Sequence, residues 1–274
     1  MNKILITFCT AIAAFAVTVR AQSPAFTDIP YNPSGNAYAA ERCKLDIYIP
    51  DNVKDGCPTV VWFHGGGLTG GDKSVIPRAL KESGYILVSA NYRLIPRGGI
   101  ADCISDAAAA VAWTFKHIEE YGGTPERIFV SGHSAGGYLT DMIGLDKRWL
   151  AAYGIDADRI AGLIPFSGQV VTHFAQRKAQ GIGELQAVVD PFAPLYHVRA
   201  DAPPIVIISG DREMELYGRY EEQAYFWRMM KLVGNENVFL YEFDGYDHGE
   251  MPYPAHSVVK RYIKGICKGE LPQR

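Results

Sequence analysis

One short segment constrains the fold of this chain more than any other: Gly132-His133-Ser134-Ala135-Gly136 stands between a β-rich run and a helical stretch. The run before it, Ile128-Phe129-Val130-Ser131, has the composition of a buried strand. A G-x-S-x-G sequence in this position predicts a turn so tight that side chains at the flanking positions would clash, hence the glycines. Such a turn pushes the serine hydroxyl out at the edge of a sheet, next to a helix N-terminus. The segment therefore predicts strand-to-helix connections and makes Ser134 a candidate nucleophile.

The rest of the chain alternates apolar, β-rich runs with amphipathic stretches. We expect strands at Lys44–Ile49, Thr59–Phe63, Tyr85–Ala90, Arg127–Ser131, Ile160–Phe166, Pro204–Ser209 and Val238–Phe243. We expect helices at Asp102–Glu120, Ser134–Leu145, Tyr217–Val233 and Pro254–Cys267. This alternation predicts an α/β fold with a mostly parallel sheet and helices on both faces. Functional residues in such folds gather at the C-terminal ends of the strands.

The first 21 residues have the pattern of a targeting segment. Lys3 precedes an apolar run from Ile4 to Val19, which is short of the ~20 residues that span a bilayer as a helix. Val19-Arg20-Ala21 then resembles a cleavage site before Gln22. The pattern predicts a signal peptide at 1–21, export to the periplasm or the medium, and one domain at 22–274; the alternatives are an uncleaved anchor or a core helix. Residues 22–40 are expected to be an irregular arm.

Composition is that of an ordinary globular protein, with 48% hydrophobic and 21% charged residues. The formal net charge is −3, and no stripe of Lys and Arg would follow a phosphate backbone, which argues against nucleic acid as a partner. No Cys or His spacing indicates a zinc site. Four cysteines remain after the expected cleavage, and the sequence leaves open whether they form disulfides: Cys43, Cys57, Cys103 and Cys267.

A second motif, His64-Gly65-Gly66-Gly67, directly follows another apolar, strand-like run. Acyl transfer develops negative charge on a carbonyl oxygen, and preorganised donors aimed at that oxygen usually provide the largest stabilisation. Because backbone without side chains approaches a substrate closely, we expect the N–H groups of Gly66, Gly67 and Ala135 to form an oxyanion hole. His64 is expected to brace this loop. The alternative interpretation of the glycine run is a flexible turn.

A serine hydroxyl needs a base to remove its proton. Of the seven histidines, His248 follows the expected strand Val238–Phe243 by a short loop and precedes the last expected helix. This position lies over the strand ends, so we assign His248 as the general base; the alternative is a surface loop histidine. The other histidines lie within the motifs or in helical or irregular segments.

The acid that orients the histidine should follow a strand between Ser134 and His248 in the chain. Asp211 and Glu213 both follow the buried run 205–208. In hydrolases with this kind of serine turn the acid commonly lies three residues past a glycine, a register that selects Glu213. Asp211 is the alternative acid; otherwise its carboxylate holds the turn after the strand. Whichever of Glu213 and Asp211 is not the acid could instead form a simple surface salt bridge.

With these residues in place, the chain resembles α/β-hydrolase esterases of the hormone-sensitive-lipase and carbohydrate-esterase branch over residues 41–265. It is similar to exported acetyl and feruloyl esterases that act on plant polysaccharides, with kynurenine formamidases as close kin through Glu213-Met214-Glu215, Arg219 and Gln223. The family's usual acid is aspartate, so glutamate at 213 is a departure. The resemblance rests on the opening strand Leu45–Pro50, the glycine loop, Asn91-Tyr92-Arg93-Leu94, the serine motif and Asp247-His248-Gly249.

The resemblance implies an exported serine carboxylesterase that removes short acyl groups, acetyl or feruloyl, from carbohydrates through an acyl-enzyme intermediate. It implies no metal or organic cofactor, a small-molecule or oligosaccharide ester as the partner, and no stable membrane insertion. The alternatives are a serine amidase or peptidase, and a binding protein that kept the fold and lost catalysis. The oligomeric state is left open.

Between residues 167 and 200 the strand and helix pattern weakens, which predicts a small insertion over the active site. Insertions of this kind often control substrate choice. We expect four residues to line the substrate pocket: Leu68, His133, His173 and Phe174. The alternative is a surface excursion that takes no part in binding.

Overall fold

The computed structural model describes residues 24–32, 37–51 and 53–271. The expected signal peptide at 1–21 lies outside the described residues. These residues form one eight-stranded sheet with the strand order β1-β2-β4-β3-β5-β6-β7-β8. The pairs β1–β2 and β2–β4 are antiparallel, and the strands from β4 through β8 pair in parallel. The mostly parallel sheet that the sequence predicts is therefore confirmed.

The element bounds lie close to the expected ranges. The strands are β1 (Phe26–Pro30), β2 (Lys44–Tyr48), β3 (Cys57–Phe63), β4 (Ile86–Ala90), β5 (Gly123–His133), β6 (Gly162–Phe166), β7 (Ile205–Gly210) and β8 (Val238–Phe243). The helices are α1 (Ala37–Arg42), α2 (Arg78–Lys81), α3 (Ile100–His117), α4 (Ala135–Leu145), α5 (Arg148–Ala151), α6 (Phe174–Ala179), α7 (Arg219–Leu232) and α8 (Pro252–Ile266). Three 3₁₀ turns complete the described set: Ile118–Tyr121, Ala157–Arg159 and Pro194–His197.

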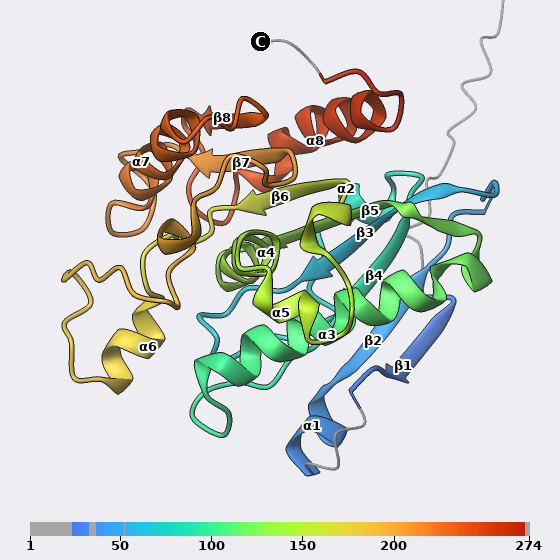
Figure 1. The fold of residues 1–274 in the computed structure, drawn as a ribbon, viewed down its shortest axis with the longest axis horizontal. Coiled ribbons are helices and arrows are strands. Elements are labelled where there is room, and N and C mark those ends of the chain that lie inside the picture. The colour runs from blue at the N-terminus through green and yellow to red at the C-terminus, as the bar shows by residue number, and fades with distance from the viewer. Residues whose placement is uncertain (1–23, 33–36, 52, 272–274) are drawn as a thin grey trace, which may run out of the picture.

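Helices cover both faces of the sheet (Figure 1). Successive residues of a strand point to opposite faces, and β3 follows this rule: Val61 and Phe63 pack in the core with α3, α4 and α7, whereas Val60 and Trp62 pack with α2 and α8. Burial on both faces accounts for the continuous apolar runs of the central strands. The ends of the strands therefore lie between two packed layers of helices.

The N-terminal arm departs from the expectation of irregular structure at 22–40. Phe26–Pro30 forms an edge strand on β2, and Ala37–Arg42 forms a short helix. All five side chains of β1 keep solvent exposure, so the strand carries no pattern of alternating burial. Backbone pairing with β2 determines its conformation.

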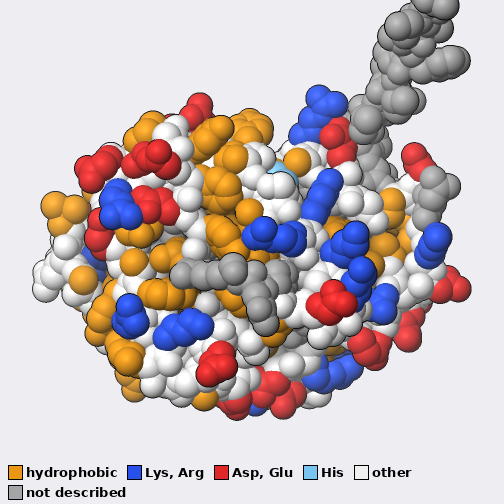
Figure 2. All heavy atoms as spheres, turned by 90° about the horizontal axis from the view of Figure 1, so that it is seen from above, with side chains coloured by type: hydrophobic (Ala, Val, Ile, Leu, Met, Phe, Trp, Pro, Cys, Tyr) orange, Lys and Arg blue, Asp and Glu red, His pale blue; other side chains and the backbone are white. Residues whose placement is uncertain are grey.

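The face in Figure 2 carries a band of hydrophobic side chains beside groups of both acidic and basic side chains. None of the helices in the described part of the chain combines the length and the apolar character needed to cross a membrane. Cys43, Cys57, Cys103 and Cys267 are free thiols, the first three of them buried. These four cysteines therefore form no disulfide within the described residues.

Candidate active site

Ser134 lies in the turn between β5 and α4, where the motif predicts it. Its φ of 56° and ψ of −114° form a conformation that residues with a side chain keep only when the surrounding structure holds them there. A Cβ added at Gly136 would lie 2.0 Å from the carbonyl oxygen of Phe63, and one at Gly132 would lie 2.5 Å from the backbone of Gly136. Close backbone approach therefore requires both flanking glycines.

The glycine loop after β3 passes beside this turn. A Cβ added at Gly65 would lie 3.3 Å from the Cβ of Ser134, and Gly66 and Gly67 have φ values of 107° and 63°. Among the described residues, no acceptor takes the backbone N–H groups of Gly66, Gly67 or Ala135. The three donors that the sequence suggests are thus free to bind a ligand oxygen.

His64 braces the glycine loop from beneath. Its ring stacks on Tyr92 with 4.4 Å between the ring centroids, and the Tyr92 hydroxyl donates to the carbonyl oxygen of His64 at 2.8 Å. Burial lowers the pKa of His64 to about 4. A neutral ring that is held in this way fits the bracing role that the sequence suggests.

His248 lies in the loop between β8 and α8, and its Nδ1 is 2.8 Å from Oε2 of Glu215. The Glu215 side chain is 1% exposed. Its carboxylate also accepts the N–H of Gly210 at 2.9 Å and that of Leu216 at 3.1 Å. Burial opposes ionisation, but the hydrogen bonds and the charge of His248 outweigh it and lower the pKa of Glu215 to about 2. Glu215 is therefore a buried carboxylate anion against the histidine.

The expected acids, Glu213 and Asp211, do not contact His248, and this corrects the assignment. Glu213 is exposed. Asp211 accepts the N–H of Glu213 at 2.9 Å and that of Gly245 at 2.8 Å, so it holds the turn, as the alternative interpretation states. The N–H of Glu215 bonds to the carbonyl oxygen of Asp211 at 2.8 Å. Because of this helical turn, the carboxylate that reaches His248 belongs to Glu215, two residues after the expected position.

Ser167 completes the surroundings of the histidine, and the sequence analysis missed it. It follows β6 with a φ of 47°, and its Oγ lies 2.9 Å from Nδ1 of His248. Its hydroxyl also forms a hydrogen bond with Glu215 that helps to lower the pKa of the carboxyl. A serine directly after a buried strand that neighbours β5 is the only sequence signal for this role, and it is weak.

The four residues expected to line the substrate pocket lie in different surroundings. Leu68 is completely buried in the core. His173 is 1% exposed and caps α6, because its Nδ1 accepts the N–H of Ala175 at 3.2 Å. Buried to this extent, neither side chain offers surface to a substrate, and this corrects both expectations. Core packing and helix capping account for these two residues.

His133 and Phe174 do line described cavities, one each. His133 also donates from Nε2 to the backbone oxygen of His248 at 2.8 Å, which ties the serine turn to the histidine loop. Phe174 packs over the glycine loop, since a Cβ at Gly67 would meet its ring at 2.8 Å. The small insertion predicted at 167–200 therefore closes one side of the site, through the residue that begins α6.

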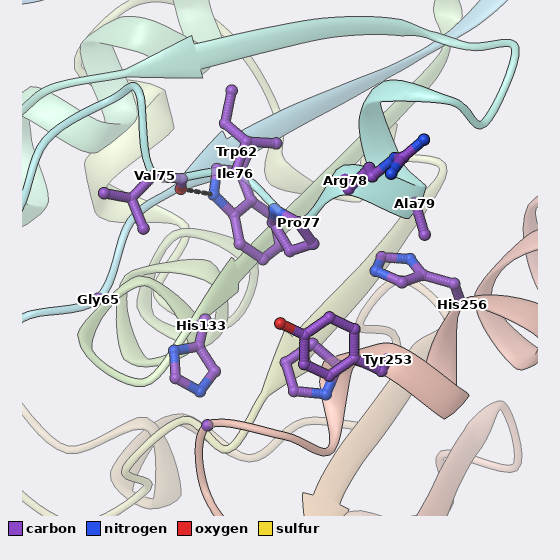
Figure 3. A pocket seen from close by; sticks show the side chains of 12 residues that line it. Trp62, Gly65, Val75, Ile76, Pro77, Arg78, Ala79, His133, Tyr253 and His256 are labelled. Atoms are coloured by element: carbon purple, nitrogen blue, oxygen red, sulfur yellow. Dashed lines mark hydrogen bonds between the residues drawn. The ribbon is translucent and has the colours of Figure 1, made fainter. Parts of the chain in front are cut away.

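Two cavities flank the site. The first holds about 420 Å³ and is bounded by Gly65, His133 and Gly249, the chain neighbours of Gly66, Ser134 and His248. In Figure 3, Trp62, Tyr253 and Pro77 surround this cavity, and Nε1 of Trp62 donates to the carbonyl oxygen of Val75 at 3.0 Å. The second cavity holds about 400 Å³ between the insertion and α7, and its walls include Phe174 and Leu216.

We found no group of three or more His, Cys, Asp or Glu side chains placed to hold a metal ion within residues 24–32, 37–51 and 53–271. The groups that this site offers for chemistry are its serine, its histidine–carboxylate pair and its backbone donors. His133 Nε2, in the residue before Ser134, lies 2.8 Å from the backbone oxygen of His248, so the serine turn and the histidine loop are in contact. A serine, a histidine–carboxylate pair and free N–H groups are the components of nucleophilic acyl transfer.

Comparison with known proteins gives a family match and several relatives. The BD-FAE family model matches residues 45–195. The probable carboxylic ester hydrolase LipM of Mycobacterium tuberculosis is 32% identical over 207 residues, which are 67% of this chain and 47% of that protein. The isoprenylcysteine alpha-carbonyl methylesterase ICME of Arabidopsis thaliana is 35% identical over 218 residues, 70% of this chain and 51% of that protein. The chain thus spans about half the length of these curated relatives.

Solved structures share the fold. The apo form of Thermogutta terrifontis esterase 2 has a TM-score of 0.68 and 26% identity, and the match covers 85% of this chain and 92% of that one. A truncated carbohydrate esterase from gut microbiota has a TM-score of 0.75 over 90% of this chain and 98% of that one. Its identity is 17%, so it is evidence for the fold alone.

Proposed function

The chain belongs to the BD-FAE family, whose model matches more than half of its 274 residues, and on that premise we propose that it hydrolyses carboxylic esters with Ser134 as the nucleophile. The observation that carries this proposal is the 2.8 Å contact between His248 and the buried carboxylate of Glu215, beside a serine held in a strained turn. A surface histidine would have no such partner. The fold by itself would not identify the chemistry.

The mechanism follows from the hydrogen bonds of His248. With its Nδ1 proton directed at Glu215, the ring keeps Nε2 free to accept a proton from the Ser134 hydroxyl. The serine oxygen attacks the ester carbon, and the N–H groups of Gly66, Gly67 and Ala135 stabilise the oxyanion. His248 then returns the proton to the leaving alcohol. Glu215 stabilises the imidazolium through both transfers without taking a proton itself.

The second half of the reaction regenerates the enzyme. Water enters where the alcohol departed, gives a proton to His248 and attacks the acyl-serine carbon. The carboxylic acid leaves as the proton returns to the Ser134 oxygen. No step needs a metal or an organic cofactor, because the two carbon–oxygen bond exchanges use only the serine, the histidine and water.

The substrates we propose are short acyl esters, acetyl or feruloyl, carried on carbohydrates. The two cavities beside the serine turn support this, because sites of about 420 and 400 Å³ fall in the usual range for small-molecule ligands. Aromatic walls such as Trp62 and Tyr253 (Figure 3) suit a flat phenolic ring or a sugar face. The signal-like sequence at 1–21 supports export to the compartment where such polymers are found.

The experiment compares the wild type with Ser134→Ala on a short 4-nitrophenyl ester, with circular dichroism to check the fold. We expect the substitution to remove turnover down to the background rate while the fold persists. A panel of acetylated xylan, feruloyl sugars and N-formylkynurenine then separates the substrate classes. Exclusive cleavage of N-formylkynurenine would favour the amidase alternative, and hydrolysis that survives Ser134→Ala would overturn the proposal.

A further inference from the structure

The cavity between the insertion and α7 has an unusual wall for an ester site. It holds about 400 Å³, and its lining includes Gln169, Phe174, Arg177, Tyr217 and Arg219. It adjoins the catalytic groups on two sides, because Phe174 packs on Gly67 and the lining residue Leu216 directly follows Glu215. A substrate group that extends past Phe174 would therefore enter this cavity.

Arg219 is the residue whose interactions are incomplete. Its side chain is buried, with the residue 3% exposed, and Nη1 donates to the carbonyl oxygen of Ser167. Nε is buried without a hydrogen-bond partner, and no described residue accepts a hydrogen bond from Nη2. No described carboxylate forms an ion pair with the guanidinium. The charges of Glu222 and Glu215 act on Arg219 from beyond ion-pair distance and favour its charged form, but burial outweighs them and lowers its pKa. A buried guanidinium with an unpaired donor is costly, and native structures rarely keep one without a reason.

Other arginines in the chain show what the free edge of Arg219 is suited to bind. Arg93 directs Nε and Nη2 to the two oxygens of Asp106 at 2.7 and 2.8 Å. Arg148 uses the same two nitrogens on Asp146, at 2.9 and 2.7 Å. This side-on pair of donors matches the spacing of carboxylate oxygens. In Arg219 the same two nitrogens have no described acceptor, and Nε is enclosed by the surrounding protein.

Two of the other charged side chains of the cavity, Arg177 and Glu222, already make hydrogen bonds. Arg177 donates from Nε to the carbonyl oxygen of Thr172 at 2.9 Å and from Nη1 to three further carbonyls. Glu222 accepts the N–H of Val170 at 3.2 Å, and burial raises its pKa. Glu184 is exposed at the rim. None of these residues forms an ion pair with Arg219, although the charge of Glu222 acts on it.

We propose that this cavity is a subsite for a carboxylate on the ester substrate, bound by the guanidinium of Arg219. The inference rests on the proposed ester hydrolysis at Ser134 and adds a substrate class to it: esters that carry a second, free acid group. That group reaches the subsite from either the acyl or the alcohol portion of the ester. The two arms of the test distinguish these portions.

The test uses pairs of esters of matched shape. On the acyl side, 4-nitrophenyl hemisuccinate is compared with 4-nitrophenyl 4-methylpentanoate, in which an isopropyl group replaces the carboxylate. On the alcohol side, 4-acetoxybenzoate is compared with 4-acetoxybenzamide. We expect the wild type to show a higher kcat/KM for the charged member of at least one pair, and the pair that responds identifies the portion that carries the acid. Equal kcat/KM values within both pairs would overturn the proposal.

Substitution of Arg219 separates binding of the substrate from support of the Ser167 turn. Arg219→Gln should lower kcat/KM for the charged ester by about tenfold or more beyond its effect on the neutral partner, because a charged hydrogen-bonded pair is lost. Arg219→Lys keeps the charge but not the paired donors. Its preference for the charged ester, measured as the ratio of kcat/KM values, should therefore lie between those of the wild type and Arg219→Gln. The control Arg212→Gln removes an exposed arginine that pairs with Glu242 and should leave the ratio unchanged. Equal losses on both esters would mean that Arg219 only holds the turn.

A measurement on the wild type alone covers the case in which the Arg219 variants do not fold. Succinate should inhibit hydrolysis of the neutral ester competitively, and its neutral analogue succinamide should not. Equal inhibition by the two compounds would contradict the subsite. Failure of the neutral ester to react, or its hydrolysis by Ser134→Ala, would instead defeat the proposed function, so the two failures are distinguishable.

Discussion

Glu215 shows at the scale of single residues how donors set the chemistry of a buried carboxyl. Backbone N–H groups of Gly210 and Leu216, the ring of His248 and the hydroxyl of Ser167 all favour the ionised form. Together they outweigh burial, and the pKa of Glu215 falls to about 2. The carboxylate therefore stays charged at any pH where the protein is expected to work.

The assignment of Glu215 leads to a direct comparison. Glu215→Gln should reduce kcat for a short ester by on the order of 10²–10⁴, because a neutral amide neither fixes the histidine tautomer nor stabilises the imidazolium. The matched control Glu213→Gln alters an exposed side chain two residues away and should change kcat by less than about twofold. Steady-state kinetics on both variants decide the matter. A large loss in Glu213→Gln with little in Glu215→Gln would restore the register that the sequence favours.

The acid shows why some site residues escape prediction from sequence. Ser134 and the glycine loop follow strands directly, and His248 follows the last strand by a short loop as the one histidine there, so their place at the strand ends can be read from the chain. Glu215 depends on a helical turn stabilised by its N–H bond to Asp211, and the sequence allows several carboxylates in that loop. Ser167 and Arg219 depend on contacts between segments far apart in the chain. Such contacts leave no local pattern.

At the scale of elements, the central strands and the long helices could be predicted, but the edge strand β1 could not. Val238–Phe243 has the predicted bounds, and the other core strands differ by a few residues, because burial on two faces leaves a continuous apolar run. β1 lies at the sheet edge with its side chains exposed. Its sequence therefore lacks any alternation that would mark a strand.

The serine turn is the element most sensitive to a single added carbon. In Gly136→Ala the new Cβ would lie 2.0 Å from the carbonyl oxygen of Phe63, so β3 and α4 must separate. We expect a loss of at least about 1–3 kcal/mol in the free energy of unfolding, with most of the esterase activity lost. Gly183→Ala is the control, since nothing lies within 4 Å of its added Cβ. Urea denaturation that shows equal stability for the two variants would contradict the geometry.

At the scale of the whole molecule, the parallel sheet brings five distant segments to one edge. The glycine loop, the serine turn, the residue after β6, the carboxylate loop after β7 and the histidine loop after β8 meet there (Figure 1). The fold class thus predicts the location of the site. The cavities beside it depend on how the insertion packs against α7, and side-chain packing of that kind cannot be read from one sequence.

The stability of the molecule in acid should reflect the charge of Glu215. Its pKa falls from a usual value of 4.5 to about 2 on folding. The unfolded chain then binds the proton more readily, so the ionised group stabilises the fold above about pH 4.5, and this contribution is lost as the pH falls towards 2. The difference is on the order of 3 kcal/mol. Urea unfolding between pH 5 and 2.5 should show a steeper fall for the wild type than for Glu215→Gln, and equal slopes would contradict this account.

The central claim, that Ser134 is the nucleophile, is tested most directly by covalent labelling with paraoxon. The serine oxygen should attack phosphorus, expel 4-nitrophenolate and keep the diethyl phosphoryl group. We predict one adduct per chain, mapped by peptide mass spectrometry to Ser134, slowed strongly in Glu215→Gln and absent in Ser134→Ala. A folded wild-type protein that gains no adduct, or gains it at another residue with Ser134 unmodified, would contradict the account.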